Sequence, residues 1–185
     1  MYDERPSYRL NVCDGEHPAI LLQTISQTER ICIMERNGRR LMFHCISLFL
    51  LGLLTGFAEQ HFANMRMGLA AHLEGVMNGT FLLALGAAWP NVRLGPAPSA
   101  IAFWLALYGT YFNWFITLLA AIFGTAALSP ITGVGHSGLP WQESLVTAGF
   151  MSVGIAIVLA SVMILWGLRK EILKSSQIPG SPTSD

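Results

Sequence analysis

The stretch that decides the fold is AAHLEGVMNG, residues 70–79. It places His72, Glu74 and Asn78 inside a segment that is otherwise apolar enough to cross a bilayer. A charged side chain at the centre of a membrane helix costs roughly 2.5–3.5 kcal/mol on insertion scales. A chain that keeps polar groups at this depth usually uses them as a ligand, a proton carrier or a buried structural pair. We therefore expect the functional site in this segment.

The composition around this stretch is that of a membrane protein. Of the 185 residues, 52% are hydrophobic and 12% are charged, and the mean hydropathy is +0.49. A soluble domain of this size carries roughly twice that charged fraction. The formal net charge is zero, which gives no indication of a nucleic-acid partner. The three cysteines have no metal-ligand spacing and are interpreted as reduced thiols.

Four apolar runs are long enough to form transmembrane helices, which need about 20 residues each. They cover residues 41–58, 68–89, 100–128 and 145–168. The predicted fold is an all-α integral membrane protein with a four-transmembrane-helix bundle at residues 38–170. A variable cytoplasmic N-terminal extension at 1–37 precedes it, and a disordered tail at 171–185 follows it. We expect the first 33 residues to be dispensable, because Met34 would make a natural start.

The basic residues predict the orientation of the bundle. Arginines at 36, 39, 40 and 93 and basic residues at 169, 170 and 174 lie on one side, and only Arg66 lies on the other. The positive-inside rule then places both termini in the cytoplasm, which agrees with an even number of spans. We expect an integral protein of the bacterial inner membrane.

Small residues recur at every fourth position in three of the runs: Gly52 and Gly56 in the first, 71, 75 and 79 in the second, and 152, 156 and 160 in the fourth. Such stripes let helix backbones approach closely in lipid. Packing within one chain and packing between copies of a homo-oligomer are both compatible with them.

Helical geometry separates the polar residues of the second run. At about 100° per residue, Glu74 and Asn78 lie on one face, while His72 points roughly 120° away from Asn78. His72 therefore faces one neighbouring helix, and Glu74 and Asn78 face another. The histidine suits an axial metal ligand, or it donates to a neighbouring group in the core, which spacing alone favours.

Polar residues also interrupt the third run. Asn113 and Thr117 share a face, and Tyr108 and Tyr111 do so more loosely. Amides and hydroxyls suit a small polar ligand, and they equally suit hydrogen bonds between helices. Outside the runs' centres, His44 is expected to snorkel at the membrane boundary, and Glu143 to complement a helix dipole.

The sequence lacks the motifs of several enzyme classes. It contains no GxSxG, HExxH, Walker lysine or CxxCH, and its one GxGxxG match, residues 133–138, lies in a loop between apolar helical runs and not after a strand, where a dinucleotide-binding pattern belongs. This argues against a self-contained hydrolase and against a nicotinamide enzyme.

From Gly38 to Lys170 the chain resembles the hydroxylaminobenzene mutase family of small membrane isomerases. The matching words are FLLGLLTG at 49–56, MGLAAHLEGVMNG at 67–79, FWLALYGTYFNW at 103–114 and LWGLR at 165–169. The resemblance implies an intramolecular rearrangement of hydroxylaminobenzene to 2-aminophenol, with no net redox change.

More distantly, the chain is similar to styrene oxide isomerase, a four-helix membrane family. That family holds ferric haem b between the subunits of a trimer and uses the iron as a Lewis acid toward the substrate oxygen. The resemblance makes His72 the axial ligand and matches Asn78 and Asn113 to the family's site amides. The family's acidic residue and tyrosine on the third helix fall at Gly109 and Thr117, so Tyr108 or Tyr111 would have to substitute.

The resemblance therefore implies haem b on His72 and substrate orientation by Asn78 and Asn113. Glu74 or Tyr111 would carry the ring proton, with Phe81, Trp104 and Trp114 as an apolar berth. The implied partners are a small aromatic hydroxylamine, membrane lipid and a homotrimer, and no nucleic acid. Two alternatives stay open: a haem-binding membrane subunit for electron transfer or anchoring, and an isomerase of a related substrate such as an aryl epoxide.

Overall fold

The computed structural model describes residues 18–175, and the side chains of residues 34–169. In this range the chain is all-helical, without a strand, which confirms the all-α part of the predicted fold class. Most of the predicted N-terminal extension and of the predicted C-terminal tail lies outside the residues whose side chains are described. The elements are α1 (Pro18–Ala58), η1 (Glu59–His61), α2 (Met65–Ala88), η2 (Trp89–Asn91), α3 (Pro96–Phe123) and α4 (Pro140–Ser175).

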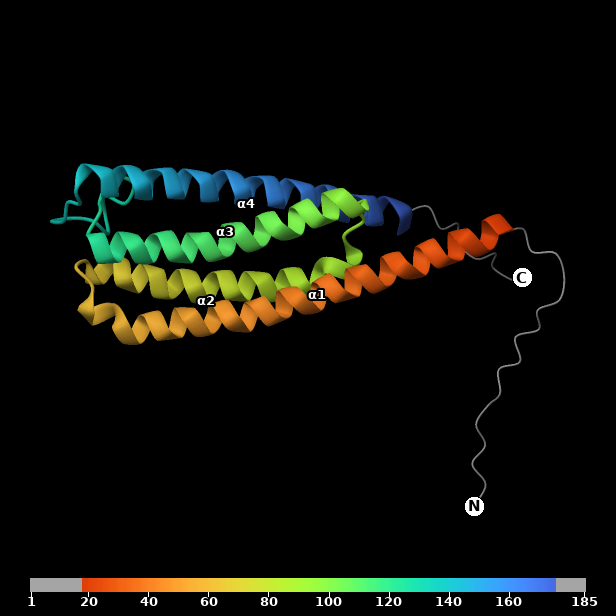
Figure 1. Ribbon diagram of the computed structural model, residues 1–185, viewed down its shortest axis with the longest axis horizontal. Helices are drawn as coiled ribbons and strands as arrows, with labels where there is room; N and C mark the ends of the chain where they lie inside the picture. The colour runs from red at the N-terminus through yellow and green to blue at the C-terminus, as the bar shows by residue number, and fades with distance from the viewer. Residues whose placement is uncertain (1–17, 176–185) are drawn as a thin grey trace, which may run out of the picture.

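The long helices run side by side, and successive helices are joined at alternating ends of the bundle (Figure 1). Each helix makes its main contacts with its neighbours in the sequence, and α1 also reaches α3. The N-terminal part of α1 projects beyond the bundle (Figure 1). The first predicted span is thus the end of a 41-residue helix.

In the part of the chain that is described, three helical segments are long and apolar enough to cross a membrane: Met34–His61, Pro96–Phe123 and Pro140–Arg169. They support a membrane protein. The expected second span is not among them. At 24 residues α2 is long enough for a hydrocarbon core of about 30 Å, but Arg66, His72, Glu74 and Asn78 lower its mean hydropathy.

The third helix ends earlier than the apolar run predicts. The run continues to residue 128, whereas α3 ends at Phe123. Gly124 adopts the left-handed conformation at φ 67°, and its N–H donates to the carbonyl of Ala120 at 2.9 Å. A glycine in this conformation is a common helix end because it has no Cβ to clash. The predicted boundary was therefore wrong by about one turn.

The small-residue stripes of the first two runs meet within one chain. A Cβ on Gly52 would lie 2.8 Å from the backbone nitrogen of Val76 and 2.9 Å from the Cα of Gly75. A Cβ on Gly79 would lie 3.0 Å from the carbonyl oxygen of Cys45. The backbones of α1 and α2 are thus in contact, which confirms packing within the chain for these stripes.

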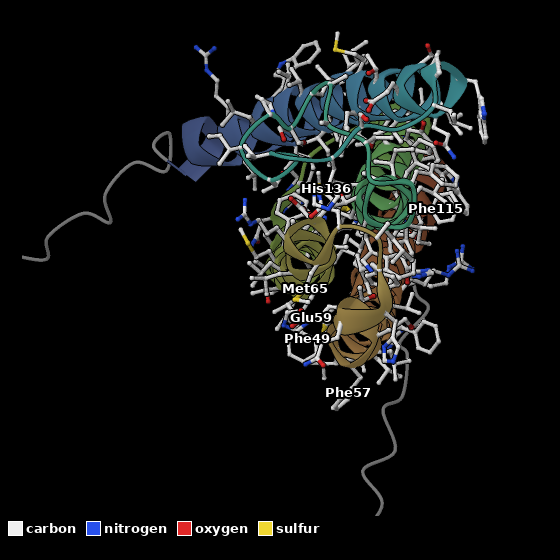
Figure 2. All side chains as sticks on the ribbon, turned by 90° about the vertical axis from the view of Figure 1, so that its left-hand side faces the viewer. Phe49, Phe57, Glu59, Met65, Phe115 and His136 are labelled. Atoms are coloured by element: carbon white, nitrogen blue, oxygen red, sulfur yellow. The ribbon has the colours of Figure 1, made fainter. Side chains whose placement is uncertain are left out.

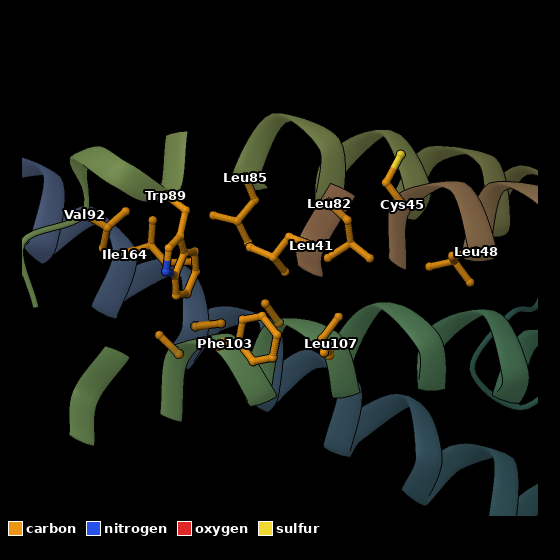
Figure 3. Packing of buried hydrophobic residues seen from close by; sticks show 13 residues of the cluster. Leu41, Cys45, Leu48, Leu82, Leu85, Trp89, Val92, Phe103, Leu107 and Ile164 are labelled. Carbon is orange, nitrogen blue, oxygen red and sulfur yellow. The ribbon is translucent and has the colours of Figure 1, made fainter. Parts of the chain in front are cut away.

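Large apolar side chains form a buried cluster inside the bundle (Figure 3). Leu41, Leu82 and Trp89 are fully buried, and the Trp89 ring packs edge-on against Phe103. This cluster joins residues of all four long helices, so it fixes how the helices face one another.

The α3–α4 loop closes the end of the bundle that faces the viewer in Figure 2. The Glu143 carboxylate accepts the backbone N–H groups of Ala126, Ala127 and Gly138 at 2.9–3.2 Å. Its main role is thus to hold the loop, beyond the expected dipole effect. His136 completes the closure, since its Nε2 lies 3.0 Å from the carbonyl oxygen of Ala63 in the α1–α2 turn.

Candidate functional site

A carboxylate and two amides lie together between α2 and α3, and we call them the Glu74 cluster. Oε2 of Glu74 accepts a hydrogen bond from Nδ2 of Asn78 at 3.0 Å and another from Nδ2 of Asn113. Nδ2 of Asn78 also lies 3.4 Å from the carbonyl oxygen of Thr110. All three cluster side chains are half-buried. The prediction that Glu74 and Asn78 share a face toward a neighbouring helix is confirmed, and that helix is α3.

The hydrogen bonds fix which atoms of the cluster stay available. An ionised carboxylate only accepts, so both amides must turn their NH2 groups toward Glu74. Oε1 of Glu74 and the side-chain oxygens of Asn78 and Asn113 then have no protein partner within the described residues. None of these oxygens is fully buried. The Glu74 cluster therefore offers three acceptor oxygens, one of them on a group that can carry a proton.

His72 lies on the other side of α2, against α1, as the helical geometry predicts. Its Nδ1 is 2.8 Å from the carbonyl oxygen of Gly52. A carbonyl can only accept, so Nδ1 carries the proton and Nε2 keeps its lone pair. No described residue hydrogen-bonds Nε2, and this atom is not fully buried. The ring thus donates to a neighbouring backbone through one nitrogen and leaves the other available as a ligand.

The two candidate tyrosines are neighbours on the surface of α3, but their hydroxyls contact different helices. The Tyr111 hydroxyl lies 3.1 Å from Nδ1 of His44 and donates to the His44 carbonyl at 3.3 Å, both in α1. The Tyr108 hydroxyl lies 2.9 Å from Oγ of Ser152 in α4. Side chains three residues apart in an α-helix point about 60° apart, so they can reach two different neighbouring helices.

His44 was expected to snorkel, and the structure instead places it half-buried against Tyr111, with the two rings edge to face at 5.7 Å. The sequence carries no signal for this pair, because it depends on how α1 meets α3. The His44–Tyr111 pair is a second polar contact between helices inside the bundle, in addition to the Glu74 cluster.

The aromatic residues expected to form an apolar berth have different surroundings. Trp114 is half-buried and donates from Nε1 to Oγ1 of Thr55 in α1 at 3.1 Å. Trp104 is 66% exposed and Phe81 is 39% exposed on the helix surface. Within one copy of the chain, only Trp114 belongs to the interior near the polar residues.

The described residues contain no group of three or more His, Cys, Asp or Glu side chains that could together hold a metal ion. A haem iron needs only one axial side chain from the protein, so a group of three or more metal ligands is not required for a haem site at His72. A groove on the outer face of α4 is apolar and contains none of the candidate site residues; it is lined by Phe150, Met151, Gly154, Ile155, Val158 and Leu159.

Comparison with known proteins identifies the family. The family model for styrene oxide isomerase matches residues 37–169. The chain belongs to the styrene oxide isomerase family. It is 48% identical over 133 residues to hydroxylaminobenzene mutase HabB of Ectopseudomonas oleovorans, which covers 71% of this chain and 81% of that protein. It is 42% identical over 124 residues to hydroxylaminobenzene mutase HabA of the same organism, which covers 66% and 92%.

No solved structure gives a significant match. The resemblance drawn from the sequence is confirmed, and the chain is an isomerase. The Glu74 cluster, His72 and both candidate tyrosines all lie inside the matched region, residues 37–169.

Proposed function

We propose that this isomerase rearranges hydroxylaminobenzene to 2-aminophenol in the bacterial inner membrane. The names of the two hydroxylaminobenzene mutases, at 48% and 42% identity, support this substrate. The observation that carries the proposal is the Glu74 cluster, because it gives a small polar molecule both hydrogen-bond acceptors and a proton carrier inside an apolar bundle.

The proposed reaction balances without an oxidant or a reductant. The N–O bond breaks and a C–O bond forms at the ring carbon ortho to the nitrogen. The proton of that ortho carbon moves to nitrogen. The chain therefore has two tasks: it must orient the hydroxylamine group over the ring, and it must hold one proton between carbon and nitrogen.

The Glu74 cluster suits both tasks. The free side-chain oxygens of Asn78 and Asn113 would accept the N–H and O–H of the substrate and so orient it. Oε1 of Glu74 would take the ring proton and return it to nitrogen, a step worth roughly 10²–10⁴-fold in rate for a well-placed group. Tyr111 is the second candidate for proton carrier and Tyr108 the third, since their hydroxyls already bond His44 and Ser152.

We propose haem b as the cofactor, held by Nε2 of His72. The residues fit this group, because metal-bound histidines almost always donate their other ring N–H to a carboxylate, a backbone carbonyl or water, and Nδ1 of His72 is 2.8 Å from the carbonyl oxygen of Gly52. When bound there, the haem would supply a Lewis-acidic iron toward the substrate oxygen.

One copy of the chain cannot direct all these groups at one substrate. His72 faces α1, whereas Glu74 faces α3 on the opposite side of α2. We therefore propose a homotrimer in which His72 of one copy and the Glu74 cluster of the next share a site. A neighbouring copy would also cover the polar sides of α2, so that α2 spans the membrane as the fourth helix, with both termini cytoplasmic.

The experiment is to incubate the detergent-purified protein with hydroxylaminobenzene, without added cofactor, and to separate the products chromatographically. We expect 2-aminophenol. Folded, haem-loaded protein that forms none would refute the substrate. Styrene oxide in a parallel reaction tests the second candidate, an aryl epoxide isomerase, which the family match favours. A bis-histidine haem spectrum without turnover of either substrate would favour an electron-transfer subunit.

A further inference from the structure

Gly52 and Gly56, the GxxxG pair of α1, do more than pack against α2. We propose that together they form a clamp that holds the His72 ring in one tautomer and one orientation, so that Nε2 is the nitrogen presented to a metal. We call this pair the glycine clamp. Its functional meaning rests on the proposed role of His72 as a ligand, whereas its geometry does not.

Gly52 supplies the acceptor. Its carbonyl oxygen has two lone pairs, one of which serves the backbone N–H four residues later in the helix. The other receives Nδ1–H of His72 at 2.8 Å. A side chain on Gly52 would collide with the backbone of α2, 2.8 Å from the nitrogen of Val76. It would push the two helices apart and move the carbonyl away from the ring.

Gly56 supplies the space for the ring. A Cβ at this position would lie 2.7 Å from Nδ1 of His72 and 3.2 Å from both Cγ and Cε1. Side chains in a helix tilt toward its N-terminus, so a side chain at Gly56 would lean over the carbonyl of Gly52. The missing side chain therefore does two things: it leaves room for the imidazole, and it uncovers the oxygen that the imidazole binds.

Gly79 is another tight glycine of this interface, and it has no such role. A Cβ on Gly79 would meet the carbonyl oxygen of Cys45 and the backbone nitrogen of Phe49, each at 3.0 Å, and no histidine. Gly79 and Gly56 thus share the contact between α1 and α2, but only Gly56 borders the His72 ring. Gly79→Ala is therefore a matched control: it disturbs the packing of α1 against α2 without touching the His72 ring.

The tautomer decides whether His72 can act as a ligand. With the proton on Nδ1, Nε2 has a lone pair to give; with the proton on Nε2, the open nitrogen becomes a donor. We expect Gly56→Ala to displace the ring, to break its bond to Gly52, and to let the proton move to Nε2. Hemin should then bind at least about tenfold more weakly, which corresponds to about 1.4 kcal/mol.

The test is nitrogen NMR of the full chain in detergent, labelled with ¹⁵N-histidine and expressed without added hemin. The protein has five histidines, so His72→Gln assigns the His72 signals. We expect a protonated Nδ1 and an unprotonated Nε2 in the unchanged protein, and a shift of the proton toward Nε2 in Gly56→Ala. Gly79→Ala and Gly154→Ala should leave the His72 signals unchanged, since a Cβ on Gly154 meets nothing within 4 Å.

Two results would overturn the clamp. One is a proton on Nε2 of His72 in the unchanged protein, which needs no variant to fold. The other is an equal shift in Gly79→Ala, which would mean that any loosening of the interface moves the proton. If the tautomer pattern is as expected but hemin gives no Soret band with the unchanged protein, the clamp stands and the proposed haem function fails.

Discussion

Glu74→Gln separates the structural role of this carboxylate from its proposed chemical role. Glutamine is nearly the same shape and keeps one side-chain oxygen with two lone pairs, so Asn78 and Asn113 can both still donate to it. Each bond falls from a charged one worth about 1.5–3 kcal/mol to a neutral one worth about 0.5–1.5 kcal/mol. The two bonds together lose about 2–3 kcal/mol at most, because a neutral amide is also easier to bury than a carboxylate. The protein should still fold.

Catalysis should lose more than stability does. An amide neither takes nor releases a proton, so the transfer from ring carbon to nitrogen loses its carrier. We expect kcat to fall by roughly 10²–10⁴-fold, the usual contribution of a positioned acid–base group. This equals about 2.7–5.4 kcal/mol in the barrier. KM should change little, because the side-chain oxygens of Asn78 and Asn113, which would orient the substrate, remain.

The assay is the initial rate of 2-aminophenol formation, with thermal unfolding in detergent measured in parallel. Glu143→Gln is the matched control, since it makes the same chemical change at the carboxylate that binds Ala126, Ala127 and Gly138 at the end of the bundle. It should lower the melting temperature and leave kcat unchanged. A Glu74→Gln protein with the kcat of the unchanged enzyme would refute proton transfer by Glu74 and make it a structural acceptor.

Three further changes test the other assignments. His72→Ala should abolish the Soret band of the purified protein while His44→Ala keeps it; a full band in His72→Ala would contradict the ligand assignment. Tyr111→Phe removes the two neutral contacts of the hydroxyl with His44, at Nδ1 and at the carbonyl oxygen, and should lower kcat by no more than about tenfold. If Tyr111→Phe lowers kcat more than Glu74→Gln does, Tyr111 and not Glu74 is the proton carrier. Asn64→Ala removes a fully buried helix cap bonded to Met67 and to the loop. It should cost about 1–3 kcal/mol and speed proteolysis of residues 124–139, and unchanged cleavage would count against this role.

Part of this site can be predicted from the sequence because successive residues of an α-helix are spaced by a fixed angle around its axis. The spacing of His72, Glu74 and Asn78 is enough to predict that they face two different neighbours, because the angle between them is set by the helix itself. The spacing cannot say which helices those neighbours are. The bond from Asn113 to Glu74 and the carbonyl of Gly52 beside His72 depend on how α3 and α1 meet α2, which no local pattern encodes.

Two further differences have local causes. The apolar run to residue 128 hides the end of α3, since hydropathy continues past the left-handed turn at Gly124. The polar residues that mark α2 as functional are the same ones that lower its hydropathy below that of the three candidate spans. A helix whose polar residues carry a site is thus the one that hydropathy is least able to identify as a span.

The division of α2 into a His72 side and a Glu74 side has a quantitative consequence for assembly. If each site takes His72 from one copy and the Glu74 cluster from the next, an inactive His72→Ala chain and an inactive Glu74→Gln chain can complement each other. When the two chains assemble at random in equal amounts, about one site in four pairs an intact His72 with an intact Glu74. Coexpression should therefore restore about a quarter of the activity of the unchanged enzyme, normalised to protein. If both groups served the same site from one copy, every site would lack one of them and no activity would return, which would refute the shared site.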